Sequence, residues 1–197
     1  MSQRVVQLTC PNCGAPAAMG CKVCEYCGRP VVITTFTSVA EMPLSEVNKY
    51  AGSYRKALAE SPDSQDLNGS IAMCYLKLKL YDKALAAFEK ALVDNFDNSE
   101  ISFYAAVCLL QGKKPFLHLR PQIDRIEEHI AAAMMIEPKG IYQYLLAYVK
   151  YDYFERKHLN TSPTWREALA SAQEAGLSLS DVDRLYELLG VERPSCL

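Results

Sequence analysis

The feature that most constrains the fold of this chain is a pair of amphipathic helical patterns between Pro62 and Phe96. Apolar residues recur in each pattern at steps of three and four, which places them on one face of a helix. Small alanines beside Phe88 would let the two helices approach closely. A two-helix hairpin cannot bury both faces alone, so further helices must pack against it. The two faces comprise Leu67, Ile71, Cys74, Tyr75 and Leu78, and Ala84, Leu85, Phe88, Ala91 and Leu92.

The same pattern of small and large apolar residues recurs along the chain. Ala57 and Ala91 are 34 residues apart, and Ala133 and Ala175 follow at spacings of 42 residues. Recurrence at such spacings is typical of a helical solenoid, in which stacked repeats bury a continuous core. The sequence therefore predicts a mainly α fold built from helical hairpins.

The 34-residue spacing, with Tyr75, Ala84, Phe88 and Ala91 in order, resembles the tetratricopeptide repeat (TPR) over residues 46 to about 190. The resemblance implies a TPR-like α-solenoid that binds protein partners in a groove lined by the first helix of each hairpin. No lysine and asparagine clamp for carboxylate tails is recognisable. The residues expected to meet a bound peptide in that groove are Asn68, Met73, Lys77, Tyr104, Tyr144 and Lys150.

Two C-x-x-C-G units precede the helical patterns, one at Cys10 and Cys13 and the other at Cys24 and Cys27. Two thiolates at this spacing can bind one metal ion if the backbone turns sharply between them, and the trailing glycine favours that turn. Two such units resemble a zinc ribbon over residues 4–36, with strands expected at 4–10 and 30–36. Four thiolates leave no open position for water, so we expect one structural Zn²⁺.

Cys21 leaves the ligand set open, because Cys21 and Cys24 form another C-x-x-C and would give the set Cys10, Cys13, Cys21 and Cys24. We favour Cys24 and Cys27, since that pair carries the glycine and repeats the first unit. A rubredoxin-like iron site, a thioredoxin-like redox pair and a redox-responsive switch at Cys21 are further alternatives.

The expected division is a zinc ribbon over residues 1–36, a linker over 37–45 and a TPR-like helical domain over 46–197. Within the helical domain, a helix is expected from Ser45 to about Ser61, first helices are expected near Asn98 and Gly140, and a closing helix is expected to end at Gly190. Two enlarged connections, 112–120 and 152–161, would then lie between the helices of two hairpins.

These two connections carry the candidate partner-binding residues, in which cations alternate with aromatic side chains. Such loops can bind an acidic peptide, a phosphate group or single-stranded nucleic acid. Alternatively, Phe116, Leu117, Tyr153 and Phe154 pack inward and anchor the loops. The candidates are Lys113, Lys114, Arg120, Tyr153, Arg156 and Lys157.

Half of the 197 residues are hydrophobic, which indicates a globular chain. The net charge of −2 does not favour binding to polyanions. No long apolar run or signal segment is recognisable, so we expect a cytoplasmic protein that does not insert into membranes. His118, His129 and His158 lie in no catalytic motif, which argues against an enzyme. The leading interpretation is a protein-binding adaptor. The alternative is a nucleic-acid-associated factor that uses the ribbon and the basic loops 113–120 and 152–161.

Overall fold

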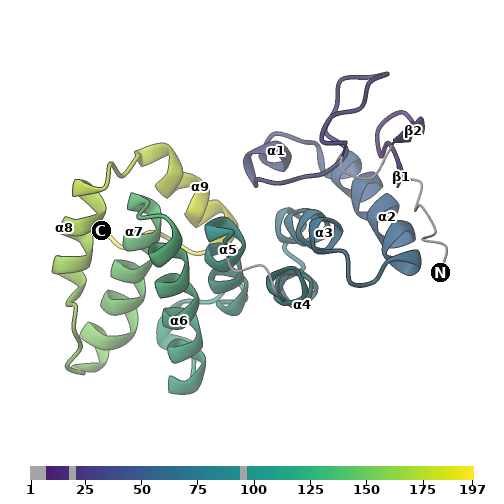
Figure 1. The fold of residues 1–197 in the computed structure, drawn as a ribbon. Coiled ribbons are helices and arrows are strands. Elements are labelled where there is room, and N and C mark those ends of the chain that lie inside the picture. The colour runs from purple at the N-terminus through teal and green to yellow at the C-terminus, as the bar shows by residue number, and fades with distance from the viewer. Residues whose placement is uncertain (1–7, 18–20, 94–96) are drawn as a thin grey trace. The chain divides into compact units, whose positions relative to one another are not determined.

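The computed structural model describes residues 8–17, 21–93 and 97–197, which divide into two compact units, Met1–Phe96 and Asp97–Leu197 (Figure 1). The described residues are mainly helical, which confirms the predicted fold class. None of their helices combines the length and apolar character needed to cross a membrane.

The first unit contains the helical hairpin predicted from the periodic pattern. Helices α3 and α4 pack side by side, and α2 packs against α3. Ala84, Phe88 and Ala91 on α4 are fully buried, so the aromatic ring fills the space that the alanines leave between the helices. The elements of this unit are β1 (Leu8–Thr9), β2 (Pro16–Ala17), α1 (Thr37–Ala40), α2 (Leu44–Glu60), α3 (Gln65–Lys77) and α4 (Tyr81–Leu92).

Strands are short in the cysteine-rich part of this unit. β1 and β2 are antiparallel, with Leu8 opposite Ala17 and Thr9 opposite Pro16. The strand predicted over residues 30–36 is wrong, because only Pro30 forms a bridge, to Val23. Residues 4–7 of the other predicted strand lie outside the described residues.

The backbone of segment 30–36 bonds to helices instead of to a neighbouring strand. The Tyr50 and Tyr54 hydroxyls of α2 donate to the carbonyls of Pro30 and Val31 at 3.1 and 2.9 Å. Ser70 of α3 accepts from the Ile33 N–H at 2.9 Å and lies 3.1 Å from the Ile33 carbonyl. These side chains satisfy polar backbone groups that a strand would have paired in a sheet.

Residues 37–45, which the sequence predicts to be a linker, include α1 and the start of α2. Val39 and Met42 are buried there, so the segment contributes to the core of the first unit. The same unit therefore contains both the two C-x-x-C-G units and the first three long helices.

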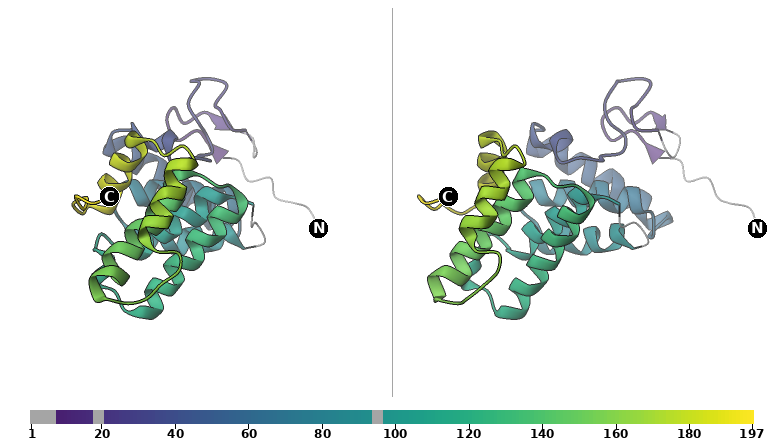
Figure 2. Two further views of the ribbon diagram at one scale, coloured as in Figure 1. Left: turned by 90° about the vertical axis from the view of Figure 1, so that its left-hand side faces the viewer. Right: turned by 60° about the vertical axis from the view of Figure 1, so that its left-hand side comes forward.

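The second unit consists of two hairpins and a closing helix. α5 packs against α6, α7 lies beside α8, and α9 contacts α7 (Figure 2). Asn98 caps α5 by accepting from the Ile101 N–H, and Gly190 follows the last residue of α9, as predicted. The elements are α5 (Ser99–Leu109), η1 (Pro115–Leu117), α6 (Arg120–Ile136), α7 (Gly140–Val149), η2 (Lys150–Phe154), η3 (Glu155–Lys157), α8 (Trp165–Glu174) and α9 (Leu179–Leu189).

The second enlarged connection is shorter than predicted. Asp152, Tyr153 and Phe154 belong to η2, a π-helical segment that continues α7, and all three side chains are buried. Burial of these side chains extends the helix beyond the point at which the sequence pattern becomes irregular. Single π-turns of this kind are common at functional sites.

Candidate functional site

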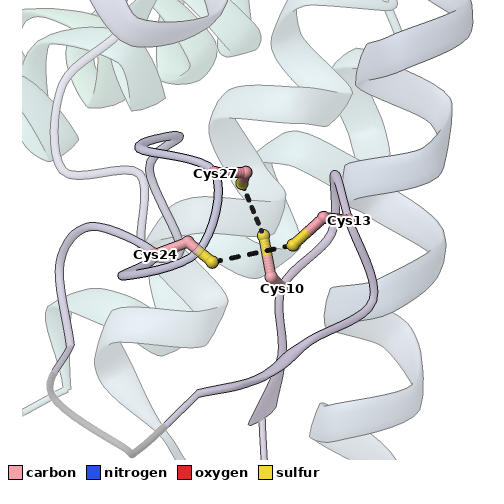
Figure 3. A group of neighbouring side chains, drawn as sticks. All are labelled: Cys10, Cys13, Cys24 and Cys27. Carbon is pink, nitrogen blue, oxygen red and sulfur yellow. Dashed lines mark hydrogen bonds between the residues drawn. The ribbon is translucent and has the colours of Figure 1, made fainter.

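The four cysteines of the C-x-x-C-G units converge on one point (Figure 3). Their sulfur atoms all lie within 4.8 Å of one another. The Cys10 and Cys27 sulfurs are 3.6 Å apart, and those of Cys13 and Cys24 are 3.7 Å apart. Sulfur atoms around a tetrahedral zinc ion with Zn–S bonds of about 2.3 Å would be separated by about 3.8 Å. The cluster can hold a metal ion, and these two separations fit zinc.

The two units have nearly the same backbone geometry. In each, the glycine N–H donates to the carbonyl of the first cysteine at 2.9 Å. The N–H of that cysteine donates to the carbonyl five residues later, at 2.7 Å in one unit and 2.8 Å in the other. Gly14 and Gly28 have φ angles of +76° and +68°, a conformation that other residues adopt at a cost. The sequence repeat thus encodes a repeated turn that directs two sulfurs toward the same centre.

The surroundings of Cys13 and Cys27 shift the pKa values of these two thiols in opposite directions. A backbone hydrogen bond from Arg29 and a side-chain bond from Asn12 lower the pKa of Cys27 to about 6. A backbone bond from Ala15 also lowers the pKa of Cys13, but desolvation and the other three cysteines raise it to about 12. Neighbouring thiolates repel one another, so a divalent cation is what would allow all four to ionise together.

The cysteine cluster is anchored to the helices of the first unit. Cys10 and Cys24 are buried, and the Ser53 hydroxyl of α2 donates to the Thr9 carbonyl at 3.3 Å, next to Cys10. Cys21 does not belong to the cluster, and its thiol lies 3.3 Å from the Val23 carbonyl. The structure therefore brings together the ligand set favoured from the sequence.

Replacing Gly14 with alanine should weaken the first turn without causing a clash. No atom lies within 4 Å of a Cβ built at this position, so only the positive φ opposes the substitution. We expect Gly14→Ala to lower the free energy of unfolding by about 1 kcal/mol, measured by chemical denaturation. Gly52→Ala is the matched control, because Gly52 lies in α2 without a positive φ. Equal losses in both variants would contradict this account.

The two basic connections of the second unit contact each other. The Arg156 guanidinium and the Lys157 ammonium lie 4.5 and 4.9 Å from the centre of the Phe116 ring, and Lys157 also lies 3.8 Å from that of Tyr153. Asp152 joins the two segments, because its carboxylate accepts from the Phe116 N–H at 2.8 Å and from Arg156 at 2.6 Å. Cation–π contacts and a buried carboxylate thus hold the two connections together.

The remaining candidates of these connections differ in their surroundings. Arg120 lies 4.7 Å from the Phe154 ring centre and donates to Asp124 at 2.7 Å. Lys113 and Lys114 are both exposed, but only Lys114 lines a pocket of about 310 Å³ that it shares with Arg156. Tyr153 is buried, which agrees with an anchoring role for the loop aromatics.

Three residues expected to meet a peptide in the groove have structural contacts instead. The Asn68 amide donates to the carbonyls of Pro62 and Ser64, both at 2.9 Å. Tyr144 is fully buried and packs edge-on against Tyr186, and Lys150 is buried beside Glu127. A partner therefore cannot reach these side chains without displacing them.

The sequence argument missed Tyr148 and Arg193, which line the same pocket as Lys114 and Arg156. In the sequence, Tyr148 belongs to a run of tyrosines at helical spacing, which is typical of a core face. Arg193 follows the last helix, where no periodic pattern indicates a contact. Only the folded arrangement of the C-terminal segment beside α7 and η2 reveals the pocket.

Comparison with a family model supports the helical-repeat assignment. Residues 51–107 match the sequence model of the tetratricopeptide repeat family. A solved structure described as "MamA MSR-1 C2" shares 17% identity, covers 78% of this chain and 72% of its own, and has a TM-score of 0.46. No curated protein matches the chain significantly. The chain thus combines a region that matches the tetratricopeptide repeat model with an N-terminal cluster of four cysteines that can hold a metal ion.

Proposed function

We propose that this protein is a non-enzymatic adaptor whose helical array binds protein partners and whose N-terminal ribbon contains one structural zinc ion. The match of residues 51–107 to the tetratricopeptide repeat carries the proposal. Stacked helical repeats present extended surfaces that suit protein recognition. A cytoplasmic location belongs to the same proposal, since a reducing compartment would keep the eight cysteines as free thiols.

Zinc would be held by Cys10, Cys13, Cys24 and Cys27. A four-thiolate site is closed to water and substrate, so the ion would contribute folding free energy and no catalysis. A structural role for the ion is supported by the chain that follows the cysteines, because segment 30–36 is hydrogen-bonded to α2 and α3. A stable ribbon would in turn keep those helix faces covered.

A nucleic-acid-binding function receives less support from the basic connections. Stacking of bases requires accessible aromatic faces. Cations lie over the Phe116 and Tyr153 rings, and Arg156 is paired with Asp152. The arrangement favours recognition of a discrete group over stacking along a single strand.

Affinity capture with the full chain from native cell extract, carried out with and without nuclease treatment, tests the adaptor function. We expect a saturable set of protein partners that nuclease does not remove. A variant with Lys113, Lys114, Arg156 and Lys157 changed to glutamate provides the comparison. Recovery of nucleic acid alone, with binding in physiological salt that this variant loses, would overturn the adaptor function in favour of the alternative.

A further inference from the structure

A pocket of about 310 Å³ lies within the second unit, where the loop before η1, the end of α7, η2 and the C-terminal segment meet. It is lined by three cationic side chains from three separate segments, Lys114, Arg156 and Arg193. One water molecule occupies about 30 Å³ of liquid, so the pocket has room for a group much larger than a single ion.

The three cations retain hydrogen-bonding capacity. Lys114 is exposed and has no ion pair with another described residue. Arg193 donates from Nε to the Leu197 carbonyl at 2.8 Å, and Arg156 donates from Nη1 to Asp152 at 2.6 Å. A guanidinium has five N–H groups, so both arginines have further donors for a ligand.

The Tyr148 hydroxyl is the second observation that points to a ligand. Tyr148 is fully buried and lines the pocket, and its hydroxyl oxygen has no hydrogen-bond partner. A buried hydroxyl without a partner is costly, and such groups in folded proteins usually meet water or a ligand. The pKa of Tyr148 is raised by burial and by Asp152 and is lowered by Arg156, two residues that also line the pocket. Burial therefore keeps the hydroxyl protonated, so it can donate a hydrogen bond, and the two charged groups lie close enough to affect its pKa.

Two acidic residues also line the pocket, but they do not cancel the positive charge of its three cations. Asp152 is buried and accepts hydrogen bonds from Phe116 and Arg156, so its charge is used to hold Arg156 in place. Glu192 is exposed and lies at the same pocket. It would repel an anion modestly, because solvent screens exposed charges. Three cations against one uncommitted carboxylate leave the pocket suited to a negative group.

We propose that this pocket binds a phosphorylated side chain of a protein partner. The inference rests on the proposed adaptor function and assigns the chemistry by which one partner segment is recognised. A phosphate group carries up to two negative charges and three acceptor oxygens. Arginines from two segments, one lysine and one tyrosine hydroxyl can satisfy those oxygens from several directions, whereas a carboxylate offers only two.

The binding test uses the full chain and titrates it by calorimetry at fixed ionic strength with three probes. These are N-acetyl-O-phosphoserine N-methylamide, the corresponding glutamate derivative and inorganic phosphate. We expect the phosphoserine derivative to bind at least about tenfold more tightly than either of the other two. No heat of binding from the phosphoserine derivative at millimolar concentration would overturn the proposal. Equal binding of inorganic phosphate would also overturn it, and would indicate a small-molecule site.

Tyr148→Phe separates a ligand-binding role from a structural one. The substitution removes a hydroxyl that has no protein partner, so the thermal midpoint should stay the same or rise. Affinity for the phosphoserine derivative should fall about tenfold, because a hydrogen bond to a charged group is lost. A lower midpoint with unchanged affinity would show that Tyr148 is only part of the core.

Lys113 and Lys114 form a matched pair for the charge contribution, since they are adjacent and exposed but only Lys114 lines the pocket. Lys114→Glu should lower affinity for the phosphoserine derivative at least about tenfold, and Lys113→Glu less than about twofold. Glu192→Gln should raise that affinity a few-fold. Equal losses in the two lysine variants would indicate a diffuse basic surface and overturn the pocket assignment. If partners are captured normally by Lys114→Glu, the pocket proposal fails while the adaptor function stands.

Discussion

Cys27→Ser is expected to abolish stoichiometric metal binding and to unfold the cysteine-rich segment. Structural zinc contributes about 10–16 kcal/mol to folding in small zinc-binding peptides, and a site with three thiolates loses a large part of that energy. The damage should spread to α2 and α3, because Tyr50, Tyr54 and Ser70 would lose their partners in segment 30–36. Elemental analysis of the purified full chain should show one zinc per chain in the unchanged protein and much less than one in the variant. Thermal unfolding should show a lower midpoint.

Cys21→Ser is the matched control, because it removes a thiol of the same segment that lies outside the cluster. It should retain one zinc per chain and the thermal midpoint of the unchanged protein. Loss of zinc from Cys21→Ser with retention by Cys27→Ser would mean that Cys21 is the fourth ligand. One iron per chain in the unchanged protein would show that the metal assignment is wrong.

Glu127→Leu should lower the free energy of unfolding by about 3–5 kcal/mol, because it leaves a buried ammonium without its carboxylate. The Lys150 side chain is 7% exposed, and its Nζ lies 2.6 Å from Glu127 and donates to the Thr161 hydroxyl at 2.6 Å. The ammonium also lies 4.6 Å from the centre of the Phe154 ring. These contacts connect α6, η2 and the segment before α8. Chemical denaturation of the full chain measures the loss.

The double variant Glu127→Leu/Lys150→Met provides the control for this pair. Replacing both charges with apolar side chains of similar size removes the unpaired ammonium, so most of the lost stability should return. The single variant Lys150→Met completes the comparison. If the stability lost in the double variant equals the sum of the losses in Glu127→Leu and Lys150→Met, the two charges are not a coupled buried pair. The comparison also separates the ion pair from the loss of packing that any substitution at this position causes.

The helical hairpin and the cysteine pairing are the parts of this protein that could be read from local pattern. Burial of Ala84, Phe88 and Ala91 follows from their spacing, since an apolar stripe on a helix must face a neighbour. The pairing of Cys10 and Cys13 with Cys24 and Cys27 follows from two identical turns that each end in glycine. Both features depend on residues within one turn or one repeat of each other.

Segment 30–36 and the basic connections could not be predicted in the same way. The apolar run from Val31 to Ile33 has strand character, but its backbone partners are side chains of two helices, one about 20 residues and the other 37 residues away. The cations at Arg156 and Lys157 look solvated in the sequence, yet they lie over aromatic rings. Contacts between distant residues have no local signature.

Sequence alone determined the helical hairpin and the two repeated cysteine turns, because turn chemistry and periodicity act over a few neighbouring residues. Only the tertiary structure decided that Lys114, Tyr148, Arg156 and Arg193 meet at one pocket. Those residues span 80 positions of the chain, and their meeting depends on how a loop, a π-helical segment and the C-terminal residues pack together. Packing over such separations is a property of the whole unit and is not encoded in any one stretch.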